Sequence, residues 1–405
     1  MAEEPMAKLR VLDLTHYIAG PYCTKLLAGL GAEVVKIERP DGGDPARRLG
    51  PFPDDIPDPE KSGLFLYLNT SKKGITLNLK TETGKKIFKE LVKDTDVLVE
   101  NFEPRVMPSL GLDYETLEKV NPRLIMTSIS NFGQTGPYRD YKAQEINMAA
   151  LGGIMYMTGD PEREPLKEPG STVQFTAGCN AAAATIAACY EQKMSGSGQH
   201  VDVSILESVI SLLDVYTLVW NRSRLTIKRM GNHMPASFYP GGMGGHGIYP
   251  CKDGYIGVTV MSLDNLVLIA ALTGMDELAD PDIGDGYARY IHRDKFEKLF
   301  MKALKNQEKE KLFCSAQENR LLWGAVRNIG EVINSTHYQE RGFWIKIDHP
   351  KAGPQTYPRL PFIMSETETI MERAPLLGEH NEEIYCKRLA YSRDDLAKLR
   401  GTNVI

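Results

Sequence analysis

The chain has 405 residues, of which 42% are hydrophobic and 25% charged, the balance of a globular protein long enough for two domains. Its formal net charge of −5 offers no broad positive surface to nucleic acid or to an anionic membrane, so neither is expected as a partner. No apolar run approaches the ~20 residues of a bilayer span and the first residues do not resemble a signal peptide, so we expect a cytoplasmic protein.

Residues 10–39 begin an α/β domain. They contain a short apolar strand, a Gly-Pro break, an amphipathic helix and a second strand, which together form a βαβ unit with a parallel pair. The segment 15–21 lacks the GxGxxG turn that holds a pyrophosphate, so NAD is not expected as a cofactor. Further strands are predicted at 64–69, 75–79, 97–100, 124–129 and 201–204, and helices at 83–93 and 114–120. This alternation predicts an α/β fold with a doubly wound, Rossmann-like sheet.

Two loops of the predicted sheet could meet a ligand. The basic turn TSKKG at 70–74 would usually lie in solvent, but with Lys80 it could also contact a phosphorylated molecule. The loop NFGQTGPYRDY at 131–141 follows a strand, at the edge where open α/β sheets bind their ligands. Glu145 begins the next helix, and its carboxylate either serves the helix dipole or belongs to a site.

An Ala-rich run at 176–194 is predicted as a helix, because alanine is the best helix former. Its small side chains allow another backbone to approach closely, so we expect a central, buried helix. Gln174 stands just before it, where unpaired N–H groups and the helix dipole favour an anionic ligand. A packing helix with a polar cap is the alternative. No Asp, Glu or His occurs from Pro169 through Tyr190.

The six cysteines are scattered and form no CxxC pair, so no metal site is expected. Most are expected to pack as small core residues. Cys179 lies one turn into the predicted Ala-rich helix. Because helix N-termini lower the pKa of a thiol, Cys179 is a candidate reactive thiol.

The chain changes character after a helix predicted at about 206–220. Residues 222–240 are polar, and 241–247 read GGMGGHG, which is either a mobile loop near a ligand or a plain linker. A strand at 254–260 and helices at 263–272 and 295–304 indicate a separate small unit. We predict a large Rossmann-like domain at 1–225, a small α+β domain at 226–330 with the Gly-rich loop, and a C-terminal segment at 331–405 that returns to the large domain.

Taken together, these motifs resemble the family III CoA-transferases, the group that includes formyl-CoA transferase and the acyl-CoA racemases. The matching segments are VLDLTHYIAGPYCTKLLAGLGAEVVKIERP, NTSKKGITLNLKT, DVLVENFEP, NPRLIMTSISNFGQTGPY, SGSGQHVDVSILES, IDHPKAGP and APLLGEHNEEI. The resemblance is close over about 9–225, moderate over 330–405 and weak across the small unit.

This resemblance implies an interlaced dimer of ring-like chains and coenzyme A, or acyl-CoA, as the substrate held along the large domain. The positions that match the family's CoA-contacting residues are His16, Ala19, Arg39, Leu77, Lys80, Asn101, Phe102 and Lys142. The cations among them can neutralise the phosphates of CoA, while Leu77 and Phe102 can flank the adenine. Arg105 departs from the family, which commonly has Gly there.

The family's reaction resembles a covalent relay in which an Asp carboxylate attacks the thioester, forms a mixed anhydride and then an aspartyl-CoA thioester. The position that matches this Asp is Gln174, whose neutral amide cannot form the anhydride. A small slip in alignment does not supply an acid, because none lies between Glu168 and Glu191. The resemblance therefore implies a transferase site without its nucleophile.

Two further departures from the family's pattern bear on the type of enzyme. Ile18 stands where formyl-CoA transferases have a Gln that contacts the intermediate. Gln144 and Glu145 stand where racemases have His-Asp, although Glu145 matches a Glu of the transferases. Gln144 and Gln174 together disfavour a racemase.

The preferred hypothesis is one subunit of a heteromeric CoA-transferase, in an interlaced heterodimer or higher assembly with a homologous chain that carries the catalytic carboxylate. Two-subunit members that resemble this arrangement serve anaerobic aromatic degradation and pass CoA from succinyl-CoA to an arylsuccinate such as benzylsuccinate. One alternative is a homodimeric protein that binds acyl-CoA without catalysis. Another is an active homodimer that uses Cys179 or Glu145 as its nucleophile.

Overall fold

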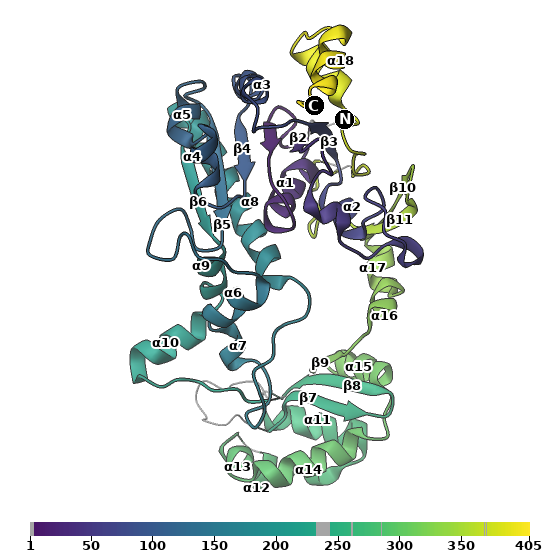
Figure 1. The fold of residues 1–405 in the computed structure, drawn as a ribbon. Coiled ribbons are helices and arrows are strands. Elements are labelled where there is room, and N and C mark those ends of the chain that lie inside the picture. The colour runs from purple at the N-terminus through teal and green to yellow at the C-terminus, as the bar shows by residue number, and fades with distance from the viewer. Residues whose placement is uncertain (1–3, 232–243, 261, 285, 368, 370) are drawn as a thin grey trace. The chain divides into compact units, whose positions relative to one another are not determined.

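The computed structural model describes residues 4–231, 244–260, 262–284, 286–367, 369 and 371–405. The chain divides into two compact units (Figure 1). The large unit comprises Met1–Gly152, Pro169–Leu212 and His337–Ile405, and the small unit comprises Gly153–Glu168 and Leu213–Thr336. Residues 241–243 of the predicted Gly-rich loop lie outside the described residues.

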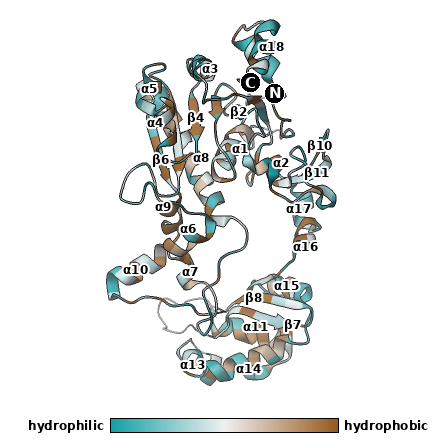
Figure 2. Ribbon diagram, viewed as in Figure 1, coloured by the Kyte–Doolittle hydropathy of each residue, from teal (hydrophilic) through white to brown (hydrophobic). Residues whose placement is uncertain are grey.

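The large unit is built on a parallel sheet of six strands in the order β3-β2-β1-β4-β5-β6. The strands are β1 (Arg10–Asp13), β2 (Glu33–Glu38), β3 (Lys72–Thr76), β4 (Val97–Glu100), β5 (Ile125–Ser130) and β6 (His200–Ser204). This is the doubly wound order, in which the topological switch point lies between β1 and β4. The predicted α/β fold class and the Rossmann-like sheet are confirmed. Figure 2 shows hydrophobic residues along β4, as expected for a strand buried on both faces.

Helices cover the sheet and their apolar residues form its core. Ile87 and Phe88 of α3, for example, are completely buried with Leu98 of β4, and Ile384 and Tyr385 from the C-terminal segment pack in the same cluster. The helices of this unit are α1 (Ala19–Gly29), α2 (Gly63–Leu68), α3 (Glu82–Val92), α4 (Val106–Leu110), α5 (Tyr114–Glu118), α6 (Glu145–Leu151), α8 (Thr172–Ser195), α9 (Ile205–Ile210), α17 (Thr336–Glu340) and α18 (Arg393–Gly401), beside a hairpin of β10 (Trp344–His349) and β11 (Gly353–Pro358).

Three sequence predictions about elements are wrong. The apolar run at 64–69 forms helix α2, because the Ser62 side chain accepts a hydrogen bond from Phe65 N and caps a helix there. The basic turn at 70–74 is instead the start of strand β3 at Lys72. The single helix at 206–220 is interrupted, and α9 is followed by α10 (Asp214–Ser223).

The small unit packs helices on a three-stranded antiparallel sheet, which confirms its α+β class. Its core contains the stacked Phe296 and Phe300 beside Trp323. Residues 153–168 join this unit, and Arg229 donates hydrogen bonds to three of their carbonyl oxygens. Its elements are α7 (Ile154–Met157), α10, β7 (His246–Cys251), β8 (Gly254–Thr259), α11 (Leu263–Thr273), α12 (Pro281–Gly284), α13 (Gly286–Ile291), α14 (Arg293–Leu304), α15 (Lys309–Glu318), β9 (Leu322–Ala325) and α16 (Ile329–Ile333).

Candidate functional site

The N-terminal half of α8 lies directly against α1 in the large unit. A Cβ added to Gly178 of α8 would lie 2.7 Å from the carbonyl oxygen of Ala19, the first residue of α1. Tyr22 of α1 also meets Phe175 of α8 edge to face, with ring centroids 4.8 Å apart. The small residues of α8 therefore permit the close backbone approach that the sequence predicts. They bring the predicted positions Ala19 and Gln174 into one region of the molecule.

The close approach of α1 and α8 at Gly178 leads to a testable prediction about stability. We expect Gly178→Val to lower the free energy of unfolding by about 2 kcal/mol, because its branched side chain has to push α1 away from α8. The control is Ala183→Val on the exposed side of the same helix, where only a helix-propensity loss of about 0.5 kcal/mol is expected. Urea denaturation of both variants measures the difference, and equal losses would contradict close packing at Gly178.

Gln174 lies in the first turn of α8, because the helix begins at Thr172 and not after Gln174 as predicted. The N-terminus of α8 is occupied by the Glu145 carboxylate, which accepts hydrogen bonds from Val173 N at 2.9 Å and Gln174 N at 3.3 Å. Glu145 begins α6, so this carboxylate offsets the dipole of α8 as well as that of its own helix. The structure therefore places Gln174 and Glu145 together.

Cys179 does not have the environment of an activated thiol. It is the eighth residue of α8, about two turns from the helix start, and the first-turn N–H groups are far along the helix from it. Partial burial raises the pKa of its thiol, although a contact with the Tyr22 hydroxyl acts in the opposite direction. The predicted lowering of this pKa by the helix N-terminus is wrong.

Three of the predicted CoA-contacting residues lie together where β1 and β4 end, at the switch point of the sheet. His16 N donates to the Asn101 side-chain oxygen at 2.8 Å, and the Asn101 amide donates back to His16 O at 2.8 Å. The Phe102 ring meets the His16 ring edge to face at 5.2 Å. Burial lowers the pKa of His16, so its imidazole is neutral at neutral pH. We call His16, Asn101 and Phe102 the switch-point cluster.

The three predicted cations all have exposed side chains. Arg39 follows β2, Lys80 precedes α3, and Lys142 lies in the loop before α6, where its ammonium group pairs with the Glu103 carboxylate. Such cations are free to turn toward a phosphorylated ligand. Leu77 differs from them. It is only 2% exposed and packs in the hydrophobic core of the large unit, so in this conformation its side chain does not reach the surface.

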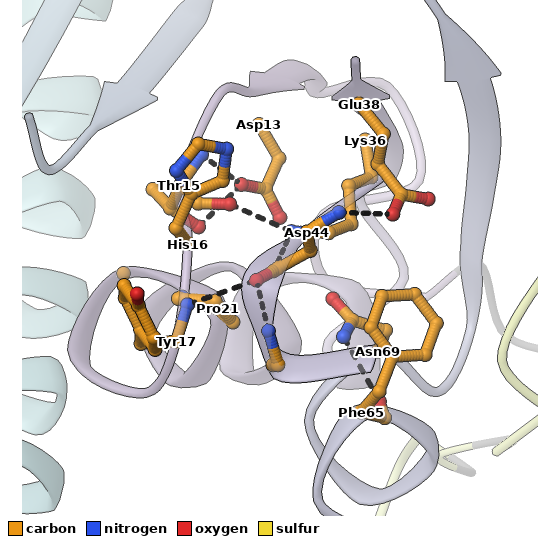
Figure 3. Close-up of polar contacts among 12 residues, drawn as sticks. Asp13, Thr15, His16, Tyr17, Pro21, Lys36, Glu38, Asp44, Phe65 and Asn69 are labelled. Carbon is orange, nitrogen blue, oxygen red and sulfur yellow. Dashed lines mark hydrogen bonds and ion pairs between the residues drawn. The ribbon is translucent and has the colours of Figure 1, made fainter. Parts of the chain in front are cut away.

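A buried charged network lies under the loop that carries His16 (Figure 3). Asp13 at the end of β1 is fully buried and accepts hydrogen bonds from the hydroxyl groups of Thr15 and Thr24, at 2.5 and 2.7 Å. Lys72 of β3 donates to the same carboxylate at 2.9 Å. Burial lowers the pKa of Lys72 to about 8, but attraction to Asp13 opposes this and the ammonium form predominates at neutral pH.

The same network shapes the backbone next to His16. Lys36 donates to Thr15 O at 2.7 Å and pairs with Asp44 at 3.0 Å, and Asp44 accepts a hydrogen bond from Tyr17 N at 3.2 Å. Tyr17 has a φ of 63°, a left-handed conformation that is uncommon for a residue with a side chain and that such contacts can hold in place. Sequence reasoning missed this network, because its lysines resemble surface lysines.

The described residues contain no group of three or more His, Cys, Asp or Glu side chains that could hold a metal ion. Among the described helices, none combines the length and the hydropathy that crossing a membrane requires.

Comparisons with known proteins identify the family of this chain. Residues 6–381 match the model of CoA-transferase family III. The chain is 33% identical to succinyl-CoA–D-citramalate CoA-transferase of Chloroflexus aurantiacus, over 99% of this chain and 98% of that protein. It is 29% identical to subunit BbsE of succinyl-CoA:(R)-benzylsuccinate CoA-transferase of Thauera aromatica, over 98% of each.

A solved structure shares the fold over nearly the whole chain. The CaiB/BaiF family protein from Brucella suis matches with a TM-score of 0.85 and 28% identity, and the match covers 95% of this chain and 100% of that one. The family match thus includes the six-stranded sheet, the switch-point cluster and the whole of α8. The chain belongs to CoA-transferase family III, which includes enzymes that move CoA between carboxylic acids.

Proposed function

We propose that this chain is the non-nucleophilic subunit of a heteromeric CoA-transferase and is interlaced with a homologous subunit that carries the covalent chemistry. The observation that carries this proposal is the chemistry of the first turn of α8. An uncharged amide stands at Gln174, and the neighbouring Glu145 carboxylate binds the helix N–H groups. An amide is not a nucleophile toward a thioester, so this chain alone is expected to be inactive.

Binding of CoA by this chain is the second part of the proposal. The switch-point cluster lies at the carboxyl ends of β1 and β4, where doubly wound sheets bind their ligands. The exposed cations Arg39, Lys80 and Lys142 would neutralise the phosphates of CoA. Ala19 at the start of α1 would lie beside the ligand, and the Phe102 ring would flank the adenine. The buried side chain of Leu77 would need to move to contribute.

For the acids, we propose succinyl-CoA as the donor and an arylsuccinate such as benzylsuccinate as the acceptor. This choice rests on the similarity to subunit BbsE over nearly the whole length of both chains. It is separable from the proposal that the chain lacks the nucleophile, because the transfer chemistry is the same for other acids.

The test purifies the chain in two ways, alone after heterologous expression and as the native complex from its source cells. We expect native mass spectrometry of the complex to show two homologous subunits of similar mass. After incubation with succinyl-CoA, hydroxylamine treatment and peptide mapping are expected to find an adduct on the partner alone. A homomer that transfers CoA at ordinary rates would overturn the proposal, and an adduct on Glu145 or Cys179 would identify the active homodimer instead.

A second prediction concerns the charge beside Lys142. We expect Glu103→Gln to strengthen CoA binding by about twofold to fivefold at low salt, because the carboxylate that competes with the phosphates for the Lys142 ammonium is removed. Calorimetric titration with CoA measures the effect. Glu118→Gln, on α5, is the control and should leave the affinity unchanged, and high salt should reduce the difference. Equal affinities for Glu103→Gln and the wild type at low salt would contradict a role for Lys142 in binding phosphate.

A further inference from the structure

Glu100 is a buried acid with an unusual set of partners. It ends β4, and its side chain is 3% exposed. The other fully buried acids of the large unit pair with cations, as Asp13 does with Lys72 and Glu38 does with Arg47. Within the described parts of the chain, Glu100 forms no such ion pair. A buried carboxylate without a cation lowers stability, so ion pairing does not explain this residue.

The contacts of Glu100 lead directly to the switch-point cluster. Its Oε2 accepts a hydrogen bond from Phe102 N at 2.8 Å. Between these two residues, Asn101 is bound to His16 by the reciprocal pair of backbone contacts, and the Phe102 ring lies against the His16 ring. The carboxylate thus fixes the backbone of the turn whose side chains form the cluster.

A polar row continues from Glu100 across the neighbouring strands. Glu100, Ser128 and Asp202 are in register on β4, β5 and β6. Ser128 is the register partner of Glu100 and acts to lower the pKa of its carboxyl group, and the Ser128 hydroxyl lies 2.9 Å from His200 Nε2. Tyr114 of α5 stacks on the His200 ring. The charged group that acts on Glu100 is Asp202. His200 contacts Ser128 on the other side of this row, with Tyr114 and Glu115 next to it.

We propose that Glu100 is a positioning residue whose ionised carboxylate orders the Asn101–Phe102 turn for CoA. The inference rests on the proposed CoA-binding function of the switch-point cluster. A hydrogen bond from an N–H group to a carboxylate is about twice as strong as one to a neutral acceptor, so protonation loosens the turn.

The charge state of the Glu100 carboxyl group changes within the physiological range of pH. Burial raises the pKa of Glu100 to about 7, with a contribution from the negative charge of Asp202, whereas Ser128 and Phe102 N act to lower it. Below this pH the carboxyl group is neutral, and above it the group is ionised. CoA affinity is therefore expected to rise as the pH increases through about 7.

The experiment measures the Kd of CoA for the full chain by calorimetry at about pH 6 and about pH 8, with Glu100→Gln as the main variant. The amide keeps an oxygen for Phe102 N but cannot ionise, so at about pH 8 we expect affinity threefold to tenfold weaker than wild type. The variant should also lose the part of the pH dependence that Glu100 contributes, and retain only the part that comes from CoA and His16. Glu100→Ala, which lacks the acceptor, should bind more weakly still.

Two further variants separate positioning from a loss of folding. Asp202→Asn removes the negative charge that contributes to the raised pKa of Glu100 and keeps an oxygen for the hydrogen bond from Gln134 N, so it should shift the transition to lower pH. Ser128→Ala removes a partner that stabilises the ionised form, so the transition should move to higher pH. This shift tests the inference even if Glu100→Gln does not fold, and its absence would overturn the inference.

The outcomes distinguish this inference from the proposed function. If the wild type binds CoA and Glu100→Gln matches it at both pH values, the positioning role is overturned and CoA binding stands. If the wild type does not bind CoA at all, CoA binding by this chain is overturned and the inference falls with it. Thermal unfolding without ligand shows whether a weakened variant remains folded.

Discussion

Gln174→Asp is expected to convert the isolated chain into an active CoA-transferase, with a gain on the order of 10⁴-fold over the wild-type chain. The substitution places a carboxylate in the first turn of α8, at the position that the resemblance matches with the family's Asp. The helix dipole favours its ionised form there. The nearby Glu145 carboxylate acts in the opposite direction and raises the pKa of a new acid, so activity should increase with pH.

The measurement is exchange of labelled succinate into succinyl-CoA by the purified homomer. Gln174→Asn is the matched control, because it shortens the side chain by the same amount without supplying an anionic oxygen, and it should remain inactive. Hydroxylamine should release the acyl or CoA group from the peptide that holds position 174. If CoA binds and no activity appears, other positions of the site have also diverged and the prediction is wrong.

Asp13→Asn is expected to produce the largest loss of stability, about 3–5 kcal/mol in the free energy of unfolding. The change leaves the buried ammonium group of Lys72 beside a neutral amide, and it weakens the contacts of Thr15 and Thr24. Urea denaturation followed by circular dichroism measures the loss. Glu82→Gln, which removes one partner of the exposed pair with Lys85, should cost no more than about 0.5 kcal/mol.

A double variant shows whether the loss comes from the unpaired charge. Asp13→Asn combined with Lys72→Met removes both members of the pair, and we expect it to be more stable than Asp13→Asn alone. Because the network supports the loop of His16, both variants should also bind CoA more weakly. Additive losses in the double variant would show that the two side chains do not form a coupled pair.

Much of the fold could be predicted because its signals are local. The apolar strand, Gly-Pro break and helix at 10–39 contain their own periodicity, and the structure confirms this unit as β1, α1 and β2. The run LFLYL at 64–68 shows the limit of such reasoning. Five consecutive apolar residues fit a strand and a helix equally well, and the cap at Ser62 decides the outcome.

The candidate site was predictable where a residue's own chemistry decides its role. Gln174 cannot act as an acyl-accepting carboxylate in any environment, and the sequence alone is sufficient for that conclusion. Its contact with Glu145 was not predictable, because a partner 29 positions away becomes a neighbour only when α6 and α8 are packed together.

The sequence by itself determined the family, the doubly wound order of strands and helices, and the absence of an acid from the first turn of α8. The tertiary structure alone decided which charges are buried. Lys72 and Glu100 resemble ordinary surface residues in the sequence, yet one pairs with an acid 59 positions away and the other holds the turn of the switch-point cluster. The physical reason is that burial and pairing depend on neighbours brought by distant segments, whereas the reactivity of an amide is a property of the residue itself.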